Sequence, residues 1–483
     1  METKLIIDNQ HVPASNGATF SRISPTSGDV ITVAAAATLA DALKAADSAA
    51  LAFKSWSQTT PVERRTLLLK AADAIEARMP EFIRVMALEV GASEVWSGFN
   101  VMLAAGLFRE AAGLATQIQG ETIPNDKPGA MSMTVRQAAG VVLSIVPWNG
   151  PVVLAARAIA YPLVCGNTVI FRASEASPRT HALIAEAVLE AGLPPGVLNF
   201  ITNAPDDAAE IIDALIEHRA VRRINFTGST RVGRIIAMKA ASQLKRCLLE
   251  LGGKAPLVVL DDADLDAAAA ASSFGSFLYQ GQICMTTERI VVDDKVADAF
   301  VARFAERARA LLVGDPAQTG GVVIGPMVSA ASGQRLNALV EDALAKGATL
   351  VCGGLAEGAV MSATILDHVT PAMRIYDEET FGPVTTVVRV KGTEEAVRIA
   401  NDTVYGLSSA VFGTDIHRTL TVARQIDAGA VHINGPTVQN EAQSPYGGTK
   451  DSGYGKFDGR AVIDEFTELK WITISPTVQQ YPF

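Results

Sequence analysis

The chain of 483 residues is 49% hydrophobic and 19% charged, a composition typical of a folded globular protein rather than a disordered or fibrous one. Its 51 acidic and 41 basic residues give a formal net charge of −10, so its surface repels phosphate backbones and anionic lipids, and neither nucleic-acid nor membrane partners are expected. At roughly 100 to 200 residues per domain, this length predicts two to four domains.

The first part of the chain, up to about residue 117, has a mostly helical pattern. Thr60-Pro61-Val62-Glu63 has the spacing of a capping box with proline at the first helical position, so a helix is expected to begin there. The uncharged run between Arg136 and Arg157 contains two prolines, which argue against a continuous membrane-spanning helix. A buried strand followed by a buried helix is the better interpretation of this run.

Between residues 140 and 260, short apolar runs alternate with helical patterns. The expected strands are 141–146, 168–172, 197–201, 222–227 and 256–260. The expected helices begin at 151, after 178, near 206 and at 230. This alternation is typical of a parallel, doubly wound sheet, and strands that are apolar throughout imply burial on both faces.

The same alternation resumes after residue 287 and predicts a second α/β lobe. Its expected strands are 288–292, 349–352, 384–390 and 430–434, and its expected helices are 295–312, 333–346 and 393–402. Two further strand-like segments, 132–137 and 469–474, fit neither lobe. We expect them to pair as an arm, and because exposed arms of this kind often complete the sheet of a partner subunit, a homo-oligomer is expected.

The cysteine and histidine patterns do not indicate a metal site. The cysteines are Cys165, Cys247, Cys284 and Cys352. They are widely spaced without a CxxC pair, and the six histidines lack metal-ligand spacing, so no metal and no disulfide scaffold are expected. The N-terminal segment METKLIIDNQ lacks the apolar run of a signal peptide, and a cytoplasmic location is expected.

Three residues could carry chemistry. Cys284 lies between an apolar helix and a strand, where reactive side chains usually occur, although a structural thiol is the alternative for any cysteine. Glu250 stands in an apolar run, and burial would raise its pKa toward that of a general base. Asn149 follows a strand and could donate its amide N–H to a developing oxyanion, unless it is an ordinary turn asparagine.

A nucleotide would have to be bound without the usual fingerprints, because GxGxxG and Walker A sequences are absent. Residues 226–233 instead run from a strand through a glycine turn into a helix. The backbone N–H groups at that helix start, with the Ser229 hydroxyl, could bind a diphosphate. A Gly-Ser turn that caps an ordinary helix is the alternative.

Together these segments resemble the aldehyde dehydrogenase family over essentially the whole chain. The motifs are Pro-Trp-Asn at 147–149, Phe-Thr-Gly-Ser-Thr at 226–230 with Gly233, Glu-Leu-Gly-Gly-Lys at 250–254, Gly-Gln-Ile-Cys at 281–284 and Glu-Thr-Phe-Gly-Pro at 379–383. The interval from 250 to 284, which is 34 residues, is the one the family has between its base and its nucleophile.

The resemblance implies the aldehyde dehydrogenase fold, an α/β fold with two doubly wound parallel-sheet lobes and a β-arm for oligomerisation. Residues 1–117 and 141–249 would form the NAD-binding domain, and residues 250–466 the catalytic domain. Residues 118–140 and 467–483 would form the oligomerisation arm.

The resemblance also implies NAD(P)-dependent oxidation of an aldehyde to its acid through a covalent thioester. Cys284 would attack the carbonyl carbon, while Asn149 and the backbone N–H of Cys284 hold the oxyanion. Glu250 would activate the water that hydrolyses the thioester, with Gly252 and Gly253 as a hinge.

Ten residues match cofactor positions of the family. They are Pro147, Trp148, Arg172, Ser174, Glu175, Gly228, Ser229, Gly233, Glu379 and Phe381. Glu379 would bind the nicotinamide ribose, and Phe381 would pack near the ring. Glu175 would bind the adenosine ribose and repel a 2′-phosphate, which favours NAD over NADP. Arg172 stands where the family commonly has lysine, and because a guanidinium can also bind a phosphate, use of NADP stays open.

The expected substrate is an aromatic aldehyde. The candidate pocket residues are Trp96, Phe99, Gly150, Arg157, Ile283, Met285 and Tyr446. Gly150 stands where many aliphatic-aldehyde members carry a bulky aromatic side chain, so its small size would open space for a substrate ring. Arg157 would bring a cation toward the substrate, with pairing to a nearby carboxylate as the alternative. Trp96 and Tyr446 could instead be core residues.

Salicylaldehyde, oxidised to salicylate, is the specific hypothesis for the substrate. The stretches 157–167 and 438–443 are similar to family members that oxidise salicylaldehyde in bacterial naphthalene degradation. Arg157 would then bind the ring hydroxyl, and benzaldehyde and vanillin are the alternatives. A non-catalytic protein of this fold and a CoA-acylating enzyme are rival interpretations, and the presence of Cys284 and Glu250 argues against both.

Overall fold

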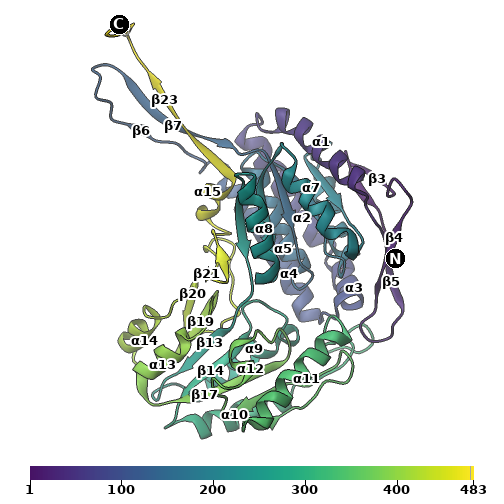
Figure 1. The fold of residues 1–483 in the computed structure, drawn as a ribbon, viewed down its shortest axis with the longest axis vertical. Coiled ribbons are helices and arrows are strands. Elements are labelled where there is room, and N and C mark those ends of the chain that lie inside the picture. Colours follow the sequence, from purple (N-terminus) through teal and green to yellow (C-terminus); the bar gives the residue numbers. More distant parts are fainter. Residues whose placement is uncertain (479) are drawn as a thin grey trace.

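The first lobe is built around an eight-stranded sheet in the computed structural model, which describes residues 1–478 and 480–483 (Figure 1). The strand order is β22 (Gly453–Tyr454), β12 (Arg246–Glu250), β11 (Val221–Thr227), β8 (Val141–Ile145), β9 (Thr168–Arg172), β10 (Leu198–Ile201), β2 (Leu5–Ile7) and β3 (Gln10–Val12). The strands from β12 to β10 run parallel, whereas those at both edges are antiparallel.

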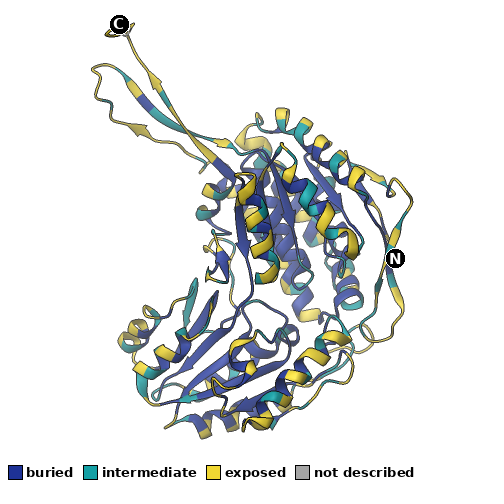
Figure 2. Cartoon of the chain, viewed as in Figure 1, coloured by how far each residue is buried: buried dark blue, intermediate teal, exposed yellow. Residues whose placement is uncertain are grey.

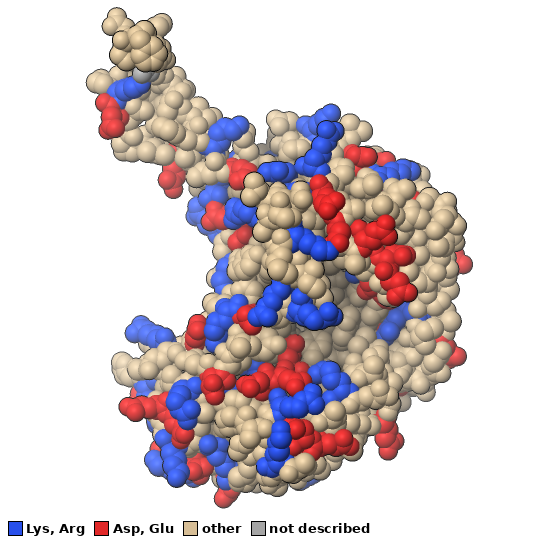
Figure 3. Space-filling view, viewed as in Figure 1, with Lys and Arg blue, Asp and Glu red and all other residues tan. Residues whose placement is uncertain are grey.

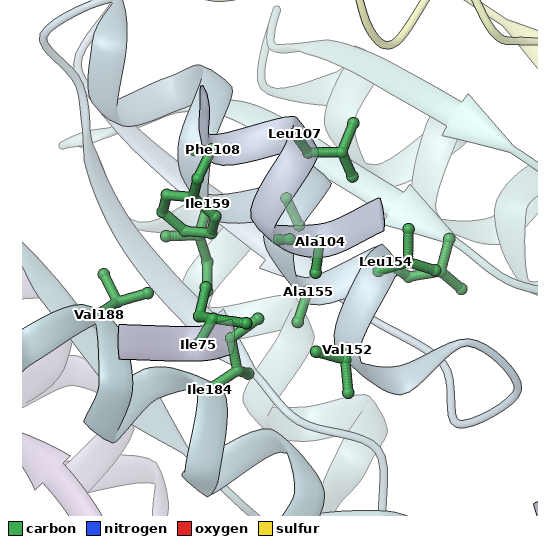
Figure 4. Packing of buried hydrophobic residues seen from close by; sticks show 14 of the residues in the cluster. Ile75, Ala104, Leu107, Phe108, Val152, Leu154, Ala155, Ile159, Ile184 and Val188 are labelled. Carbon is green, nitrogen blue, oxygen red and sulfur yellow. The ribbon is translucent and has the colours of Figure 1, made fainter. Parts of the chain in front are cut away.

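Helices cover both faces of this sheet. One face carries α1 (Leu39–Trp56), α7 (Ala208–Glu217) and α8 (Thr230–Ser242). The other carries α2 (Pro61–Ala77), α3 (Met79–Val90), α4 (Glu94–Leu114), α5 (Pro151–Val164) and α6 (Pro178–Glu190). Because neighbouring strand residues point to opposite faces, Val142 belongs to the core of the second group, whereas Leu143 belongs to the core of the first group. Figure 4 shows Phe108 and Ile159 close together in the core of the second group.

The second lobe repeats this arrangement around a seven-stranded sheet. The order is β15 (Thr349–Cys352), β16 (Thr364–Asp367), β17 (Val384–Val390), β14 (Thr287–Asp293), β13 (Ala255–Val259), β19 (Ser408–Phe412) and β20 (Ala430–Ile433). Its cores hold α9 (Leu265–Phe277) and α10 (Ala297–Arg309) on one face, and α11 (Ala330–Ala345), α12 (Arg374–Asp377), α13 (Gly392–Asn401) and α14 (Ile416–Ala423) on the other. The prediction of two doubly wound lobes is therefore confirmed.

A separate antiparallel sheet forms the arm that projects from the first lobe (Figure 1). It consists of β23 (Thr467–Ile474), β7 (Met131–Ala138) and β6 (Thr122–Ile123). β23 and β7 pair along their full lengths, with Met133 opposite Ile472, which confirms the predicted pairing of these two distant segments. Figure 2 shows that the arm is largely exposed, in contrast to the buried strands of both lobes.

Short elements complete the described chain. They are β1 (Glu2–Thr3), β4 (Thr19–Ile23) and β5 (Val30–Ala35), which form one sheet, β18 (Tyr405–Gly406) with β21 (Thr449–Lys450), α15 (Ile463–Phe466), and 3₁₀ turns at 205–207, 278–281 and 460–462. None of the helices in the described part of the chain is both long and apolar enough to cross a membrane.

The start of α2 was predicted from the sequence, whereas the strands before α1 were not. The capping box is confirmed, because Thr60 Oγ1 accepts from the N–H of Glu63 at 3.3 Å and the Glu63 carboxylate accepts from the N–H of Thr60 at 2.6 Å. The expectation of a mostly helical first region was wrong for its first 35 residues, which form five short strands. Strands of two to six residues are too short to show a reliable alternation of apolar and polar residues. They are recognised here only from the strands with which they pair.

Candidate active site

The sequence-predicted catalytic residues converge on one cavity of about 330 Å³. Its lining is Pro147, Trp148, Asn149, Thr227, Gly228, Ser229, Glu250, Leu251, Gly252, Cys284, Glu379 and Phe381. These come from the loop after β8, the loop after β11, the end of β12, the turn before β14 and the loop after α12. Figure 3 shows the molecule hollowed between its two lobes, with acidic and basic side chains interspersed over the visible face.

Cys284 and Glu250 contact each other, and both also contact a third side chain. The Sγ atom of Cys284 lies 3.1 Å from the Tyr446 hydroxyl, and that hydroxyl donates to Glu250 Oε1, also at 3.1 Å. Tyr446 was expected as an apolar wall of the substrate pocket, and that interpretation missed the polar contact of its hydroxyl. No local pattern reveals it, because Tyr446 stands 162 residues from Cys284 and 196 from Glu250.

Burial sets the protonation of these three groups. Glu250 is fully buried, and desolvation of the carboxylate raises its pKa above the ordinary value, as the sequence predicted. Burial also raises the pKa of the Cys284 thiol, and the negative charge of Glu250 raises it further. The pKa of Tyr446 is raised by burial and then by the neighbouring Cys284. Burial therefore opposes charge on all three side chains.

Asn149 points its amide at the turn that carries the nucleophile candidate. Its Nδ2 donates to the carbonyl oxygen of Gln282 at 3.1 Å, two residues before Cys284. Its own carbonyl oxygen accepts from Trp96 Nε1 at 3.1 Å, which fixes the backbone of the loop. The amide is thus a buried donor next to the thiol, as an oxyanion site requires.

Arg157 is held by a buried carboxylate. Its Nε and Nη2 donate to the two carboxylate oxygens of Asp458 at 3.0 and 2.9 Å, and Nη2 also donates to Asn440 Oδ1 at 3.1 Å. Arg157 thus pairs with a carboxylate, and its contact with the substrate stays a prediction. The guanidinium also lies over the ring of Tyr446, with Cζ 4.4 Å from the ring centroid. Neither Asp458 nor Asn440 was recognised from the sequence.

The two glycines after Glu250 serve close packing. A Cβ at Gly253 would lie 2.3 Å from the carbonyl oxygen of Cys284, and one at Gly252 would lie 2.8 Å from Glu379 Oε2. Glu250 itself is the last residue of β12 and pairs with Thr227. The structure thus gives these glycines a steric role in addition to the hinge role that the resemblance suggested.

An acidic cluster borders the other side of the cavity. Glu379 Oε1 accepts from the N–H of Gly253 at 2.9 Å, and burial together with the charge of Glu288 raises the pKa of Glu379 to about 8. Glu288 in turn accepts from the backbone N–H groups of Thr380 and Phe381 at 2.7 and 2.9 Å. Phe381, which has a left-handed φ of 45°, meets Trp148 edge to face at 5.8 Å.

Four of the cofactor candidates lie outside the cavity lining. They are Arg172, Ser174, Glu175 and Gly233. Arg172 donates from Nε to Asn203 at 2.8 Å and pairs through Nη2 with Glu175, while Ser174 Oγ accepts from a backbone N–H in its own turn.

The glycine turn before α8 has a structural role. Ser229 caps α8 by accepting from the N–H of Val232 at 3.4 Å. A Cβ at Gly233 would lie 2.5 Å from the side chain of Leu251. Ser229 thus caps the helix, and binding of a diphosphate at this turn stays a prediction.

None of the seven substrate candidates is part of the cavity lining. The ring of Trp96 stacks on Phe99 at 5.6 Å and on Tyr279 at 5.1 Å. Trp96, Ile283, Met285 and Tyr446 are buried members of one core. Tyr279 was missed, because its stacking and its left-handed φ of 50° depend on the fold rather than on a local pattern. Gly150 begins α5, and a Cβ there would lie 3.1 Å from Val153.

The remaining thiols differ from Cys284 in their surroundings. Cys165 and Cys247 are buried among apolar residues, and desolvation raises their pKa to about 12 and about 11. Their interpretation as core residues is confirmed. Within residues 1–478 and 480–483, no group of three or more histidine, cysteine or acidic side chains could hold a metal ion.

Two lobes that meet at a cysteine, a glutamate and an asparagine around one cavity define a class of oxidoreductase. Residues 11–472 match the aldehyde dehydrogenase family, and the chain belongs to that family. It is similar to a salicylaldehyde dehydrogenase of Pseudomonas sp. strain C18, with 66% identity over 483 residues and 100% of both chains covered. A vanillin dehydrogenase of Pseudomonas fluorescens is 53% identical over 482 residues, again with 100% of both chains covered.

Solved structures show the same relationships. The crystal structure of a salicylaldehyde dehydrogenase from Pseudomonas putida G7, complexed with salicylaldehyde, matches with a TM-score of 0.99 and 66% identity, and 100% of each chain is covered. A betaine aldehyde dehydrogenase from Staphylococcus aureus in complex with NAD⁺ matches with a TM-score of 0.94 and 32% identity, covering 99% of this chain and 95% of that one.

Proposed function

We propose that this protein oxidises salicylaldehyde to salicylate with NAD⁺. The observation that carries the proposal is the convergence of the Cys284 thiol, the Asn149 amide and the Glu250 carboxylate on one cavity. The full-length similarity to salicylaldehyde dehydrogenases supports the choice of substrate.

We further propose residues 1–117 and 141–249 as the NAD-binding domain and 250–466 as the catalytic domain. Residues 118–140 and 467–483 are then the arm that joins the subunits of a homo-oligomer, which acts in the reducing cytoplasm.

The reaction begins at Cys284. Its thiolate adds to the carbonyl carbon of the aldehyde, and a thiohemiacetal oxyanion forms. The amide of Asn149 exchanges its bond to the Gln282 carbonyl for one to this oxyanion, a contribution of about 2.7 to 4 kcal/mol by analogy with similar donors. The nicotinamide of the bound cofactor supplies the acceptor for the hydride. Loss of that hydride leaves the acyl group on Cys284 as a thioester.

Glu250 then acts on water. Its Oε2 has no hydrogen-bond partner among the described residues, and the side chain borders the cavity. A water molecule next to this oxygen gives a proton to the carboxylate while its own oxygen bonds to the acyl carbon. The carbon–sulfur bond breaks, the Cys284 thiolate leaves, and the carboxylic acid is released. Burial raises the pKa of Glu250, which brings it toward the working range of a general base.

The cavity has the chemistry that a nicotinamide cofactor needs. Trp148 and Phe381 give it aromatic walls, and Glu379 offers a carboxylate to ribose hydroxyls. The backbone at the start of α8, next to Ser229, supplies N–H groups of the kind that bind a diphosphate. Glu175 disfavours a 2′-phosphate by charge repulsion, so NAD⁺ is the preferred form.

The substrate assignment rests on the aromatic group around Trp96 and on the small Gly150 at the start of α5. The guanidinium of Arg157 lies over the ring of Tyr446, and its positive charge suits the phenolic oxygen of salicylaldehyde. Vanillin is the second candidate, because a vanillin dehydrogenase is 53% identical over the full chain.

The test is a comparison of kcat/KM for salicylaldehyde, vanillin, benzaldehyde and hexanal with NAD⁺. We expect salicylaldehyde to have the highest value and hexanal the lowest, and a preference for hexanal would refute the aromatic pocket. Cys284→Ser should abolish NADH production, whereas Cys247→Ser, which alters a buried thiol of the core, should retain it. Acceleration by CoA with an acyl-CoA product would instead indicate acyl transfer to a thiol.

A further inference from the structure

The hydroxyl of Tyr446 stands between the two groups that exchange protons in the reaction. It lies 3.1 Å from Cys284 Sγ on one side and 3.1 Å from Glu250 Oε1 on the other. A phenol hydroxyl has one proton to donate and lone pairs that accept, so it can do both at once. The sequence assigned no such role to this residue, and the reaction described above leaves open how Cys284 loses its proton.

We propose that Tyr446 is a catalytic residue whose hydroxyl carries the proton of Cys284 to Glu250. The S–H bond of Cys284 breaks and its proton bonds to the Tyr446 oxygen, while the Tyr446 O–H proton bonds to Glu250 Oε1. The products are a thiolate, a neutral carboxylic acid and an unchanged phenol, so charge and atoms balance without an oxidant. The proposal rests on the proposed function, in which Cys284 is the nucleophile.

The surroundings of Tyr446 hold it in position for this transfer. Its backbone N–H donates to the carbonyl of Phe457 at 2.9 Å, and its carbonyl accepts from the N–H of Phe457 at 2.7 Å. The guanidinium of Arg157, fixed by Asp458, lies against the ring face. The side chain is 6% exposed, so thermal motion of the ring and exchange with solvent are both restricted.

Electrostatics favour the relay over release of the proton to bulk water. Cys284 and Glu250 are the acidic groups that contact the phenol, and Arg157 from α5 is the cation that faces all three. A positive charge at that place stabilises the thiolate that forms. Glu250 must release the acquired proton before it activates water, so hydrolysis follows thiol activation in time.

The experiment measures alkylation of Cys284 by iodoacetamide in the full-length protein without aldehyde or NAD⁺, from pH 6 to pH 11. Tyr446→Phe keeps the ring over Arg157 but removes the hydroxyl. We expect alkylation of Tyr446→Phe to be about 10-fold slower than that of the unchanged protein near pH 7, because a hydrogen bond to a charged group is lost. The difference in rate should narrow at high pH, where hydroxide removes the thiol proton directly. Mass spectrometry confirms the modified cysteine.

Tyr376→Phe is the matched control. Like Tyr446, Tyr376 is buried and has an arginine, Arg289, over its ring. Its hydroxyl likewise donates a hydrogen bond to a carboxylate, that of Asp402, at 2.8 Å. Its substitution should leave the alkylation profile unchanged. An unchanged alkylation profile for Tyr446→Phe would overturn the relay, because it would show that the hydroxyl has no role. A loss of alkylation rate of the same size at every pH would also overturn it, because that result would indicate only a packing role.

A double-mutant cycle tests whether the proton goes to Glu250. A glutamine at that position cannot take up a proton, so Glu250→Gln should slow alkylation near pH 7 in a similar way. The double variant with Tyr446→Phe should be no more than about twofold slower than the slower single variant, because both changes interrupt one path. Independent, multiplying effects would refute the path. Because no aldehyde is oxidised, these results can fail while the proposed oxidation stands, and the converse also holds.

Discussion

The carboxylate of Glu379 in the cavity lining leads to a prediction about pH and cofactor binding. Its pKa of about 8 means that the protein holds the carboxyl protonated at neutral pH. Desolvation is the main cause, and the neighbouring charge of Glu288 adds to it. A carboxylate accepts hydrogen bonds from ribose hydroxyls more strongly than a carboxylic acid does. Binding of NAD⁺ should therefore strengthen as the pH rises and Glu379 loses its proton.

The size of the effect follows from the fraction ionised. With a pKa of about 8, roughly one tenth of Glu379 is ionised at pH 7 and roughly nine tenths at pH 9. If the ionised form dominates binding, the Kd for NAD⁺ falls about 10-fold over this interval, a change of about 1.4 kcal/mol. Burial and the charge of Glu250 raise the pKa of the Cys284 thiol well above its ordinary value.

The assay is calorimetric titration of the protein with NAD⁺ at pH 7, 8 and 9 in the absence of aldehyde. Glu379→Gln should abolish the pH dependence and leave weak binding throughout. Glu378→Gln is the matched control, because Glu378 is exposed and paired with Arg374, and it should behave as the unchanged protein does. A Kd that is flat with pH in the unchanged protein, or a slope that persists in Glu379→Gln, would show that this carboxyl does not govern binding.

Three other variants probe the oxyanion donor, the buried ion pair and cofactor choice. Asn149→Ala should lower kcat for salicylaldehyde about 10² to 10³-fold in steady-state assays, and a loss below 10-fold would refute its role as oxyanion donor. Asp458→Asn leaves the buried charge of Arg157 without its partner and should cost about 3 to 5 kcal/mol in urea unfolding. Asp298→Asn, which removes an exposed partner of Arg389, should cost less than about 1 kcal/mol. Glu175→Gln should raise kcat/KM with NADP⁺ relative to NAD⁺, and an unchanged ratio would place cofactor choice elsewhere.

The sequence predicted those parts of the fold that local chemistry determines. The strands of 168–172 and 384–390 are apolar runs that a parallel sheet buries on both faces, and both were predicted to the residue. β12 was not predicted, because its apolar run carries the buried Glu250, which breaks the pattern. β19 carries two buried serines, so its period also does not reveal a strand.

Only those residues of the site that lie in a sequence motif could be predicted. Cys284, Glu250 and Asn149 each stand in a recognisable segment, and the structure brings them to one cavity. The partners that fix them come from far along the chain. Asp458 is 301 residues from Arg157, so no spacing rule links them, and only the packing of the chain between β20 and α15 against α5 creates the pair.

The same packing explains why the site can hold an uncharged aromatic aldehyde and still perform ionic chemistry. Burial raises the pKa of the Cys284 thiol, which stays protonated before the reaction, and the charge of Arg157 is balanced by Asp458. A neutral ring then enters without having to displace strongly hydrated ions. Negative charge reaches the sulfur only when the thiol proton moves, and it forms there next to fixed donors and a fixed cation that need no reorganisation. The free energy needed to desolvate the Arg157–Asp458 pair is thus supplied when the chain folds, and it does not add to the barrier of the reaction.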